Sequence, residues 1–390
     1  MSALINAYNR LAITLERGEG ARVWDTDGTE YLDALGGIAV TALGHSHPAV
    51  TAAITEQAAK LIHTSNVYQV KAQADLGEKL CSVAGMDKVF FSNSGAEANE
   101  AMIKIARLHA RKREIDSPAI VVMEGSFHGR TMATLSATGS RKVQAGFEPL
   151  VQGFVRVPFN DVDSLKAVAE NNPHVVAVMF EPIQGEGGIV LPDDDYIDAV
   201  RAVCDEHNWL MMLDEIQSGM GRTGKWFAYQ HSASTPDVMS VAKALGNGVP
   251  IGACLASGDA AELIQPGNHG STFGGNPLSC RVGGAVIDAI ENDKLLARAQ
   301  TLGARLLDGF KAELADVSAV TDIRGRGMML GIQFDRDCPE LVGKAMQAGI
   351  LINVTRGDTI RLLPPYVMSD AQADTLVGQL SAVVKDALAT

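Results

Sequence analysis

The chain has 390 residues, of which 46% are hydrophobic and 20% charged, and its formal net charge is −13. At roughly 150 residues per domain, this length indicates two or three domains with a substantial core. The acidic balance excludes a general nucleic-acid binder, because such a protein needs a basic surface to displace counterions.

The five cysteines include no CxxC pair, and their odd number argues against a disulfide framework or a zinc ribbon. Free thiols are typical of a reducing compartment. The N-terminal sequence lacks the apolar region of a signal peptide, and no apolar run approaches the ~18 residues needed to cross a bilayer. We therefore expect a cytoplasmic protein with neither a membrane nor a nucleic-acid partner.

The first predicted element is a hairpin. Residues 21–25 and 29–33 alternate in polarity around an Asp-Gly pair, which favours a tight turn. Shortly after it, His45 and His47 stand two positions apart, as metal ligands can. No cysteine or carboxylate cluster completes a ligand set, so a structural turn is the better interpretation and no metal site is expected.

Between about residues 88 and 255, short apolar runs each end in polar or Gly-rich sequence. Apolar runs without alternation are typical of strands buried on both faces. Helical stretches at 96–113 and 196–207 separate several of them, which is the rhythm of a parallel α/β sheet. In such a sheet, ligands bind beyond the carboxyl ends of the strands, where most of the unusual polar residues stand. The predicted strands are 88–91, 119–123, 175–180, 209–213 and 238–241.

After about residue 280 the pattern changes to a smaller α+β unit. Its predicted elements are helices at 292–314 and 371–388 and strands at 328–334, 351–354 and 360–362. We expect an N-terminal segment (1–46), a large domain (47–280) and a small C-terminal domain (281–390). The hairpin of the first segment is expected to pack with the small domain, with the large domain as the alternative.

Lys243 follows an apolar run and precedes the sequence ALGNG. A lysine at the end of a buried strand is costly unless it is paired or covalently used. A buried amine with a lowered pKa is what Schiff-base chemistry needs. For a lysine considered alone, extension of the side chain to the surface is the preferred alternative.

Asp214 directly follows the predicted strand 209–213. A carboxylate there could keep a bound pyridine nitrogen protonated, although capping of the next turn is the simpler alternative. Ser94, Gly95 and Ala96 lie between a strand and a helix, where free N–H groups bind phosphate. An ordinary turn with a serine cap would have the same sequence.

Phe127, His128 and Arg130 follow the predicted strand 119–123. The aromatic ring could stack on a planar ligand, and Arg130 could bind a carboxylate through two parallel hydrogen bonds. Arg361, inside the run TIRLLPP, is a second candidate. The sequence does not decide whether Arg361 is a partly buried binding residue or a surface residue of an edge strand.

Residues 219–224 fit the pattern GxGxxG and residues 219–225 fit GxxxxGK, both of which occur in nucleotide sites. However, Trp226 stands where a phosphate-binding loop needs Ser or Thr, and the residues up to Pro236 make a poor helix. We interpret this stretch as a Gly-rich loop and keep a nucleotide-binding protein as a distant alternative.

Six collinear segments resemble the class III aminotransferases, which use pyridoxal 5′-phosphate (PLP) and have PLP fold type I. The resemblance covers nearly the whole chain. It implies a large domain with a mainly parallel seven-stranded sheet, a smaller α+β domain, and a homodimer with shared active sites. The segments are NSGAEANEA, FHGRT, EPIQGEGG, LDEIQSGMGRTG, SVAKALGNGVPIGA and HGSTFGGNPL.

The resemblance also implies roles for individual residues. Lys243 would bond covalently to the cofactor and transfer the proton during catalysis. Asp214 would hold the ring nitrogen, Gln217 would contact the phenolic oxygen side, and Phe127 would stack on the ring. Thr272 would reach the phosphate of the neighbouring subunit's cofactor. The other cofactor-binding residues that it implies are Ser94, Gly95, Ala96, His128 and Ser271.

For the substrates, the resemblance implies that Arg130 binds the α-carboxylate of an N-acylated donor and that Arg361 binds that of glutamate. Glu186 would pair with Arg361 while the amine donor is bound, because a spare buried arginine needs a partner. The expected ping-pong reaction moves the terminal amine of N-acetylornithine to 2-oxoglutarate. It gives N-acetylglutamate 5-semialdehyde and glutamate, in arginine biosynthesis.

The identity of the amine donor depends on residues outside the six segments. Ile38 stands where the ornithine-specific relatives carry a tyrosine, which favours an acylated donor. The alternatives are other ω-aminotransferases, acting on succinylornithine, succinyl-diaminopimelate, ornithine or GABA. A non-catalytic scaffold is disfavoured, because a scaffold has no need to bury a lysine.

Overall fold

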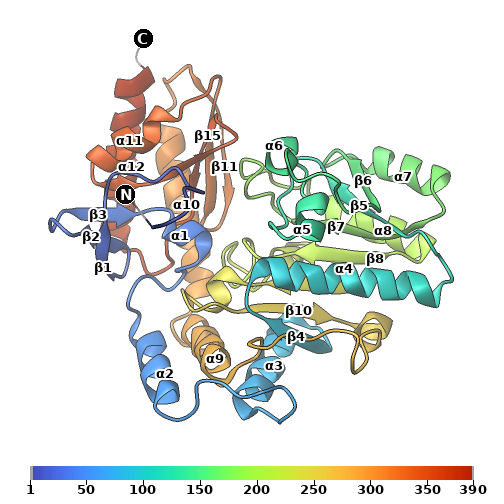
Figure 1. Ribbon diagram of the computed structural model, residues 1–390. Helices are drawn as coiled ribbons and strands as arrows, with labels where there is room; N and C mark the ends of the chain where they lie inside the picture. Colours follow the sequence, from blue (N-terminus) through green and yellow to red (C-terminus); the bar gives the residue numbers. More distant parts are fainter. Residues whose placement is uncertain (1–2, 389–390) are drawn as a thin grey trace.

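The computed structural model describes residues 3–388 and contains three sheets (Figure 1). Residues 1–2 and 389–390, the outermost residues of the predicted N-terminal segment and small domain, lie outside the described part. Within that part, no helix combines the length and the apolar character needed to span a bilayer.

The central sheet has seven strands in the order β4-β10-β9-β8-β7-β5-β6. Strand β10 is antiparallel to both of its neighbours, whereas the pairs formed by β5 to β9 are parallel. This confirms the α/β fold with a mainly parallel sheet. The strands are β4 (Lys88–Ser92), β5 (Ala119–Met123), β6 (Phe154–Val157), β7 (Val175–Phe180), β8 (Leu210–Asp214), β9 (Val238–Val241) and β10 (Gly252–Ala256).

The five predicted strands of this sheet agree with the structure to within one residue, but β6 and β10 were not predicted. In β6 the apolar sequence is too short to predict a strand, because Arg156 interrupts it. Strand β10 consists of small residues (GACLA) that carry little strand signal. Strands β5 and β7 are buried along their whole length, which explains their continuous apolar sequences.

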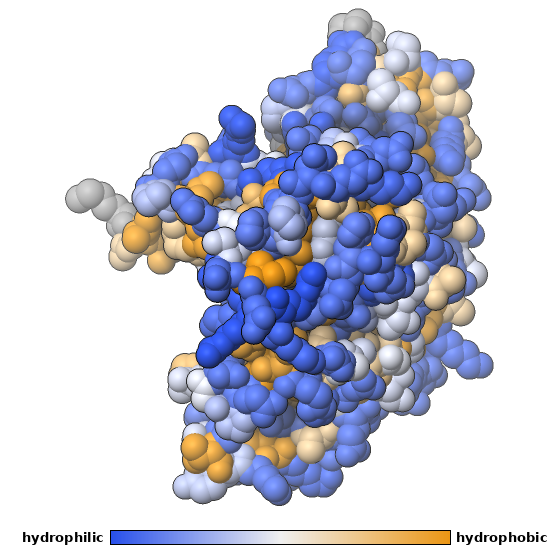
Figure 2. Space-filling model, turned by 90° about the vertical axis from the view of Figure 1, so that its right-hand side faces the viewer, coloured by the Kyte–Doolittle hydropathy of each residue, from blue (hydrophilic) through white to orange (hydrophobic). Residues whose placement is uncertain are grey.

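Helices cover both faces of the central sheet (Figure 1). Helix α4 packs across β4 and β7 to β10, and α8 packs against β8 and α7. The side on the right in Figure 1 is mainly hydrophilic, with hydrophobic residues in small separate groups (Figure 2). The helices are α2 (Pro48–Ala58), α3 (Lys71–Ala84), α4 (Gly95–Lys112), α5 (Met132–Ala137), α6 (Arg141–Gln144), α7 (Val162–Asn171), α8 (Tyr196–His207) and α9 (Pro277–Asn292), with 3-10 turns at Ala228–His231, Lys243–Leu245 and Gly258–Glu262.

The C-terminal part forms an antiparallel sheet in the order β11-β12-β15-β14 beside three helices. The prediction of one helix over 292–314 was wrong at its start, because Asn292 ends α9 and Lys294 turns with φ +54°. The elements are α10 (Leu295–Glu313), β11 (Val320–Arg326), β12 (Met329–Phe334), α11 (Glu340–Gln347), β14 (Asn353–Thr355), β15 (Thr359–Leu362) and α12 (Asp370–Leu388).

The third sheet joins the N-terminal hairpin to the C-terminal part. Its strands are β1 (Leu15–Glu19), β2 (Arg22–Asp25), β3 (Glu30–Asp33) and β13 (Ile350–Leu351), and β3 pairs in parallel with β13. The predicted strand 351–354 is therefore divided between two sheets. The short turn α1 (Gly36–Ala39) follows the hairpin.

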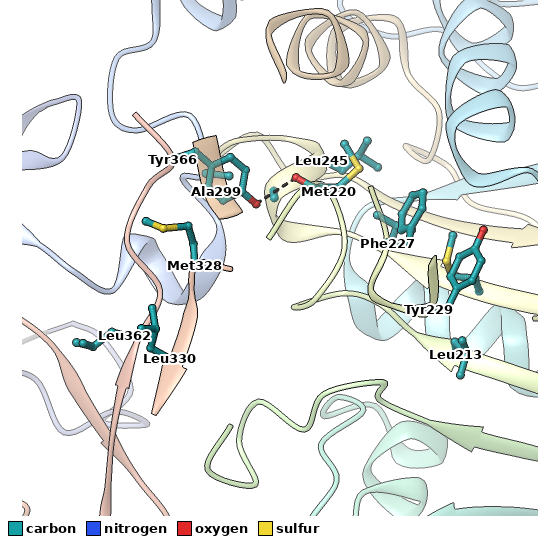
Figure 3. Close-up of a cluster of buried hydrophobic side chains, with 14 of the residues drawn as sticks. Leu213, Met220, Phe227, Tyr229, Leu245, Ala299, Met328, Leu330, Leu362 and Tyr366 are labelled. Carbon is teal, nitrogen blue, oxygen red and sulfur yellow. Dashed lines mark hydrogen bonds between the residues drawn. The ribbon is translucent and has the colours of Figure 1, made fainter. Parts of the chain in front are cut away.

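The predicted boundary after residue 280 falls inside α9, which packs on α2 and α3. The division into three parts stays a prediction. The hydrophobic core runs without interruption from the central sheet into the C-terminal sheet. Figure 3 shows the junction, where the Tyr366 hydroxyl donates to the Met220 carbonyl oxygen at 3.1 Å. This contact joins the loop after β8 to the segment after β15.

Candidate active site

A cavity of about 410 Å³ lies at the carboxyl ends of the parallel strands, where the sequence placed the site. This volume falls in the range of small-molecule sites, roughly 300–1,000 Å³. The predicted site residues that line it are Ser94, Gly95, Ala96, Phe127, His128, Arg130, Asp214, Gln217 and Lys243.

Asp214, the last residue of β8, is held by two side-chain donors. Its Oδ2 accepts hydrogen bonds from Asn99 Nδ2 at 2.7 Å and His128 Nδ1 at 2.8 Å. Asn99 also donates to the His128 carbonyl oxygen at 2.8 Å, which fixes the loop after β5 to α4. All three side chains are buried. The carboxylate is thus oriented by groups that cannot relax into solvent, which suits a fixed partner such as a ring N–H.

Lys243 begins the 3-10 turn directly after β9, with φ at +46°. Non-glycine residues rarely adopt this conformation, and strained positions of this kind gather at functional sites. Burial, with Arg361 adding to it, lowers the pKa of the Lys243 amine to about 8, although Glu186, Asp214 and Glu181 oppose the shift. No hydrogen bond or ion pair engages the amine within residues 3–388. A lysine in these surroundings has a substantial neutral, nucleophilic fraction.

The N-terminus of α4 forms the part of the cavity that could bind an anion. Ser94 caps this 18-residue helix, and its hydroxyl accepts from Glu97 N at 3.2 Å. Gly95 and Ala96 follow, where the first N–H groups of a helix have no intrahelical acceptor. A Cβ atom at Gly95 would lie 2.6 Å from Ile216 Cδ1, so glycine lets the loop after β8 approach the backbone here.

The loop after β5 brings an aromatic ring and a cation to the cavity, next to the start of α4. The Phe127 ring is half-buried, and its centroid lies 5.6 Å from the guanidinium carbon of Arg130. Arg130 is exposed and makes no ion pair among the described residues. It is therefore free to bind an anionic group that enters the cavity.

Arg361 on β15 is completely buried, which decides the question that the sequence left open. Its Nη1 forms an ion pair with Glu186 Oε1 at 2.6 Å and donates to Gln217 Oε1 at 3.4 Å. Its Nε donates to Asn353 Oδ1 at 3.2 Å, whereas Nη2 has no partner within the described chain. The Glu186 side chain is 37% exposed, so this ion pair is open to solvent on the Glu186 side. Arg361 and Glu186 do not line the cavity themselves, but Arg361 contacts Gln217, which does.

Ser271 and Thr272 are not brought to the cavity lining of the single chain. The Ser271 hydroxyl accepts from Asn93 Nδ2 at 3.1 Å, and Asn93 itself lines the cavity. Thr272 is exposed. The predicted role of Thr272 toward a neighbouring subunit stays a prediction.

The sequence reasoning missed Asn99 and Glu181. Asn99 is a polar residue on the buried face of a helix, and only its neighbours in space reveal its role. Glu181 directly follows β7 and lines the cavity. Asp214 was predicted because it is an acidic residue at the end of a buried strand. Glu181 has the same kind of position, so the same pattern could have predicted it.

The Gly-rich loop kept as a distant nucleotide-site alternative and the histidine pair at 45 and 47 both lie outside the cavity lining. Residues 219–224 do not line the cavity, and a 3-10 turn rather than an α-helix follows them. Arg222 of this loop is buried and donates to the carbonyl oxygens of Met328 and Pro364, so the loop packs on the C-terminal part. His45 Nε2 lies 2.8 Å from Asp33 Oδ2, in a structural turn. Within residues 3–388, no group of three or more His, Cys, Asp or Glu residues could hold a metal ion.

The residues present fit PLP. The Lys243 side chain is half-buried and its amine has no partner in the described chain, a state that is costly for a cation and is relieved when the amine is used covalently. A held carboxylate for the ring nitrogen and a helix N-terminus for the phosphate stand in the same cavity. His128 Nε2 and Arg361 Nη2 are buried polar atoms without a partner in the described chain, as expected where a polar ligand belongs.

The proteins that this chain resembles are aminotransferases, in agreement with a site that fits PLP. The family described as Aminotransferase class-III matches residues 4–384. The chain is 52% identical over 384 residues to the acetylornithine aminotransferase of Nitrosomonas europaea, with 98% of each chain covered. It is 53% identical over 388 residues to acetylornithine aminotransferase 1 of Bordetella bronchiseptica, covering 100% of this chain and 99% of that one.

Solved structures show the same fold. The ornithine aminotransferase from Toxoplasma gondii ME49 superposes with a TM-score of 0.95 at 35% identity, covering 99% of this chain and 93% of that one. A second structure of the Toxoplasma gondii enzyme is described with partial occupancy of PLP at its active site. The N-acetylornithine aminotransferase from Stenotrophomonas maltophilia K279a superposes with a TM-score of 0.85 at 36% identity, covering 98% of each chain.

The fold and the site thus define a PLP-dependent transaminase of fold type I. The chain belongs to the class III aminotransferases.

Proposed function

We propose that this enzyme transfers the terminal amine of N-acetylornithine to 2-oxoglutarate, giving N-acetylglutamate 5-semialdehyde and glutamate in arginine biosynthesis. The observation that carries the proposal is the ion pair between the buried Arg361 and the partly exposed Glu186, beside the unpaired Arg130. The names of the relatives from Nitrosomonas europaea and Bordetella bronchiseptica support the same donor.

When bound, PLP supplies an aldehyde that takes up an amine and a protonated ring that withdraws electrons from the substrate carbon. Lys243 would hold the cofactor covalently. Once a substrate amine has displaced it, Lys243 would carry the proton of the substrate carbon as a general base and acid. Asp214, oriented by Asn99 and His128, would hold the proton on the ring nitrogen.

The remaining walls would orient the cofactor. Ser94, Gly95 and Ala96 at the start of α4 would hold the phosphate, and Ser271 would support this end through Asn93. Phe127 would stack on the ring. Gln217, which accepts a hydrogen bond from Arg361, would contact the phenolic oxygen of the cofactor.

The two arginines address the different charges of the two substrates. N-acetylornithine has one carboxylate, which Arg130 would bind while Glu186 stays on Arg361. Glutamate and 2-oxoglutarate have two carboxylates, so Arg361 needs the second one in place of Glu186. Without this exchange, one half-reaction would leave a buried arginine unpaired, which costs several kcal/mol, on the order of 3–5.

Ile38 supports an acylated donor. It packs with the hydrophobic cluster that contains Ala39, Ile183 and Leu363, next to the cavity-lining Val40. No hydroxyl is present at this position to bind the free α-amine of ornithine. An apolar wall at this point suits the acyl group of N-acetylornithine better.

We further propose a homodimer, with Thr272 reaching the cofactor of the second subunit. The exposed side chains Leu61, Ile62, Val67, Tyr68 and Phe273 support this assembly. The two segments that carry them are joined by hydrogen bonds from Asn66 Nδ2 to the Ser271 and Gly274 carbonyl oxygens. A second copy of the chain would cover this apolar surface. The five cysteines are unpaired, which supports a reducing compartment, the cytoplasm, as the place of action.

The donor is tested by adding single amines to the PLP-loaded enzyme and following the visible absorption of the cofactor. N-acetylornithine is expected to bleach the absorption fastest, and 2-oxoglutarate is expected to restore it. Ornithine, GABA, succinylornithine and succinyl-diaminopimelate serve as the competing donors. A faster reaction with one of these would replace N-acetylornithine as the donor and leave the enzyme class unchanged.

A further inference from the structure

Two neighbouring strands of the central sheet end in acidic residues, and the mechanism above uses only one of them. Phe180 of β7 pairs with Leu213 of β8, so Glu181 and Asp214 follow side by side. Glu181 is buried and lines the cavity. A buried carboxyl without a function is costly, so its contacts deserve an explanation.

Each oxygen of the Glu181 carboxylate accepts a hydrogen bond from a different loop. Oε1 accepts from Phe127 N at 2.9 Å, and Oε2 accepts from Gly185 N at 3.0 Å. The first loop continues to Arg130, and the second continues directly to Glu186. One carboxylate therefore connects the loops that carry two of the three charged groups assigned to substrate recognition.

The contact at Gly185 leaves little room for adjustment. A Cβ atom at this residue would collide with the side chain of Gln217, so the backbone must pass close to that side chain. The N–H that Glu181 binds is thus fixed immediately before Glu186. Gly185 is therefore the fixed point next to Glu186 in the chain.

The two contacts together are strongest with an ionised carboxylate. A protonated carboxylic acid has one O–H that donates, and it cannot accept equally well through both oxygens. The titratable groups that face Glu181 are His128 from the loop after β5, Asp214 from β8 and Lys243 from the segment after β9. Burial, with Asp214 adding to it, raises the pKa of Glu181 to about 7, whereas His128 and the two backbone N–H groups oppose the shift.

We infer that Glu181 is a positioning residue. It connects the loop that carries Arg130 to the loop that carries Glu186 and fixes the position of these two side chains relative to each other. The inference rests on the proposed roles of Arg130 and Glu186 and does not depend on which amine is the donor. Loss of one of the two hydrogen bonds frees one loop. The consequence is weaker binding of both substrates, with a smaller effect on the chemical step.

The test is Glu181→Gln in the PLP-loaded enzyme, assayed with 2-oxoglutarate and with whichever donor reacts fastest. A glutamine oxygen accepts from one N–H, but its amide nitrogen cannot accept from the other. At pH 8 the KM of both substrates should rise about tenfold, the loss expected for one charge-assisted hydrogen bond. The kcat should change less than threefold. In the native enzyme the KM should rise as the pH falls through 7, and in the variant it should be flat.

Glu215→Gln is the matched control. Glu215 is also buried next to Asp214, and burial raises its pKa to about 7. It accepts from Tyr229 N and from the Ser218 hydroxyl, and it does not line the cavity. We expect the KM values of this variant to equal those of the native enzyme. An equal rise of KM in both variants would overturn the inference, because the effect would then come from any buried glutamate.

Hydrogen exchange of the native holoenzyme tests the same two hydrogen bonds without a variant, in case Glu181→Gln does not fold. After correction for the intrinsic rate, peptides that contain Phe127 and Gly185 should lose protection as the pH falls from 8 to 6. Unchanged protection there, or an unchanged KM in a folded Glu181→Gln enzyme, would contradict the inference. Neither result would bear on the choice of donor, which the spectroscopic comparison decides separately.

Discussion

The two ends of the candidate site are held in different ways. At the cofactor end, Asp214, His128 and Asn99 are buried, hydrogen-bonded to one another, and carried by elements packed on one sheet. At the substrate end, Arg361 comes from the C-terminal sheet, and its partner Glu186 is partly exposed. The first arrangement suits a ligand that stays bound throughout. The second suits two substrates that alternate and differ by one charge.

The largest effect is expected at the cofactor end. Asp214→Asn keeps the shape of the side chain but removes the charge that, in the proposed mechanism, would hold the ring proton. We expect kcat/KM to fall on the order of 10³-fold, which corresponds to ~4 kcal/mol of transition-state stabilisation. The visible absorption of bound cofactor should remain, because Lys243 is intact. A variant with more than one-tenth of the native activity would show that the cofactor end does not depend on this carboxylate.

A smaller, substrate-selective effect is expected at the other end. In Glu186→Gln the buried Arg361 has no counter-charge when a monocarboxylate donor is bound. The donor half-reaction should slow roughly 10- to 100-fold, less than for a fully buried pair because Glu186 is partly exposed. The 2-oxoglutarate half-reaction should change little, since that substrate brings its own second carboxylate. Rapid mixing with each substrate separately measures the two rates.

Glu206→Gln on α8 is the control for this experiment, because Glu206 is exposed and lies outside the cavity lining. It should leave both half-reactions unchanged. Equal slowing of the two half-reactions in Glu186→Gln would mean that the substrate end is as fixed as the cofactor end. The contrast between the two ends would then be lost.

The smallest effect concerns the pH dependence of stability. Burial raises the pKa of Glu215 to about 7. The Glu215 carboxyl of the folded protein therefore keeps its proton up to about pH 7, whereas in the unfolded protein it loses the proton near its ordinary pKa. The free energy of unfolding therefore falls as the pH rises from about 5 to 7. Relative to the native enzyme, Glu215→Gln should gain roughly 1–2 kcal/mol between pH 5 and pH 8. Denaturant unfolding at the two pH values measures this difference, and a parallel loss of stability in both proteins would contradict it.

The sequence predicted the cofactor end better than the substrate end. Strand-end positions alone placed Asp214 and Lys243 in one site, because consecutive parallel strands bring their carboxyl ends to one edge. The burial of Arg361 could not be predicted, since it depends on Glu186, Gln217 and Asn353 from other segments. Asn99 was missed for the same reason.

The errors in the fold prediction have a similar origin. Residues 351–354 are mostly apolar, but Ile352 stands between two strands that belong to different sheets. The run from Asn292 contains a turn at Lys294 that has no glycine to mark it. Local pattern predicts that an element exists, whereas its pairing and its exact ends depend on contacts with distant segments.

The central claim is that Lys243 holds the cofactor covalently. Borohydride reduction of the PLP-loaded enzyme fixes such a bond, and mass spectrometry of the digested protein then identifies the modified residue. We predict the added cofactor mass on the peptide that contains Lys243, and none on the same peptide of Lys243→Ala. Attachment to another lysine, or no attachment in the native enzyme, would contradict the account.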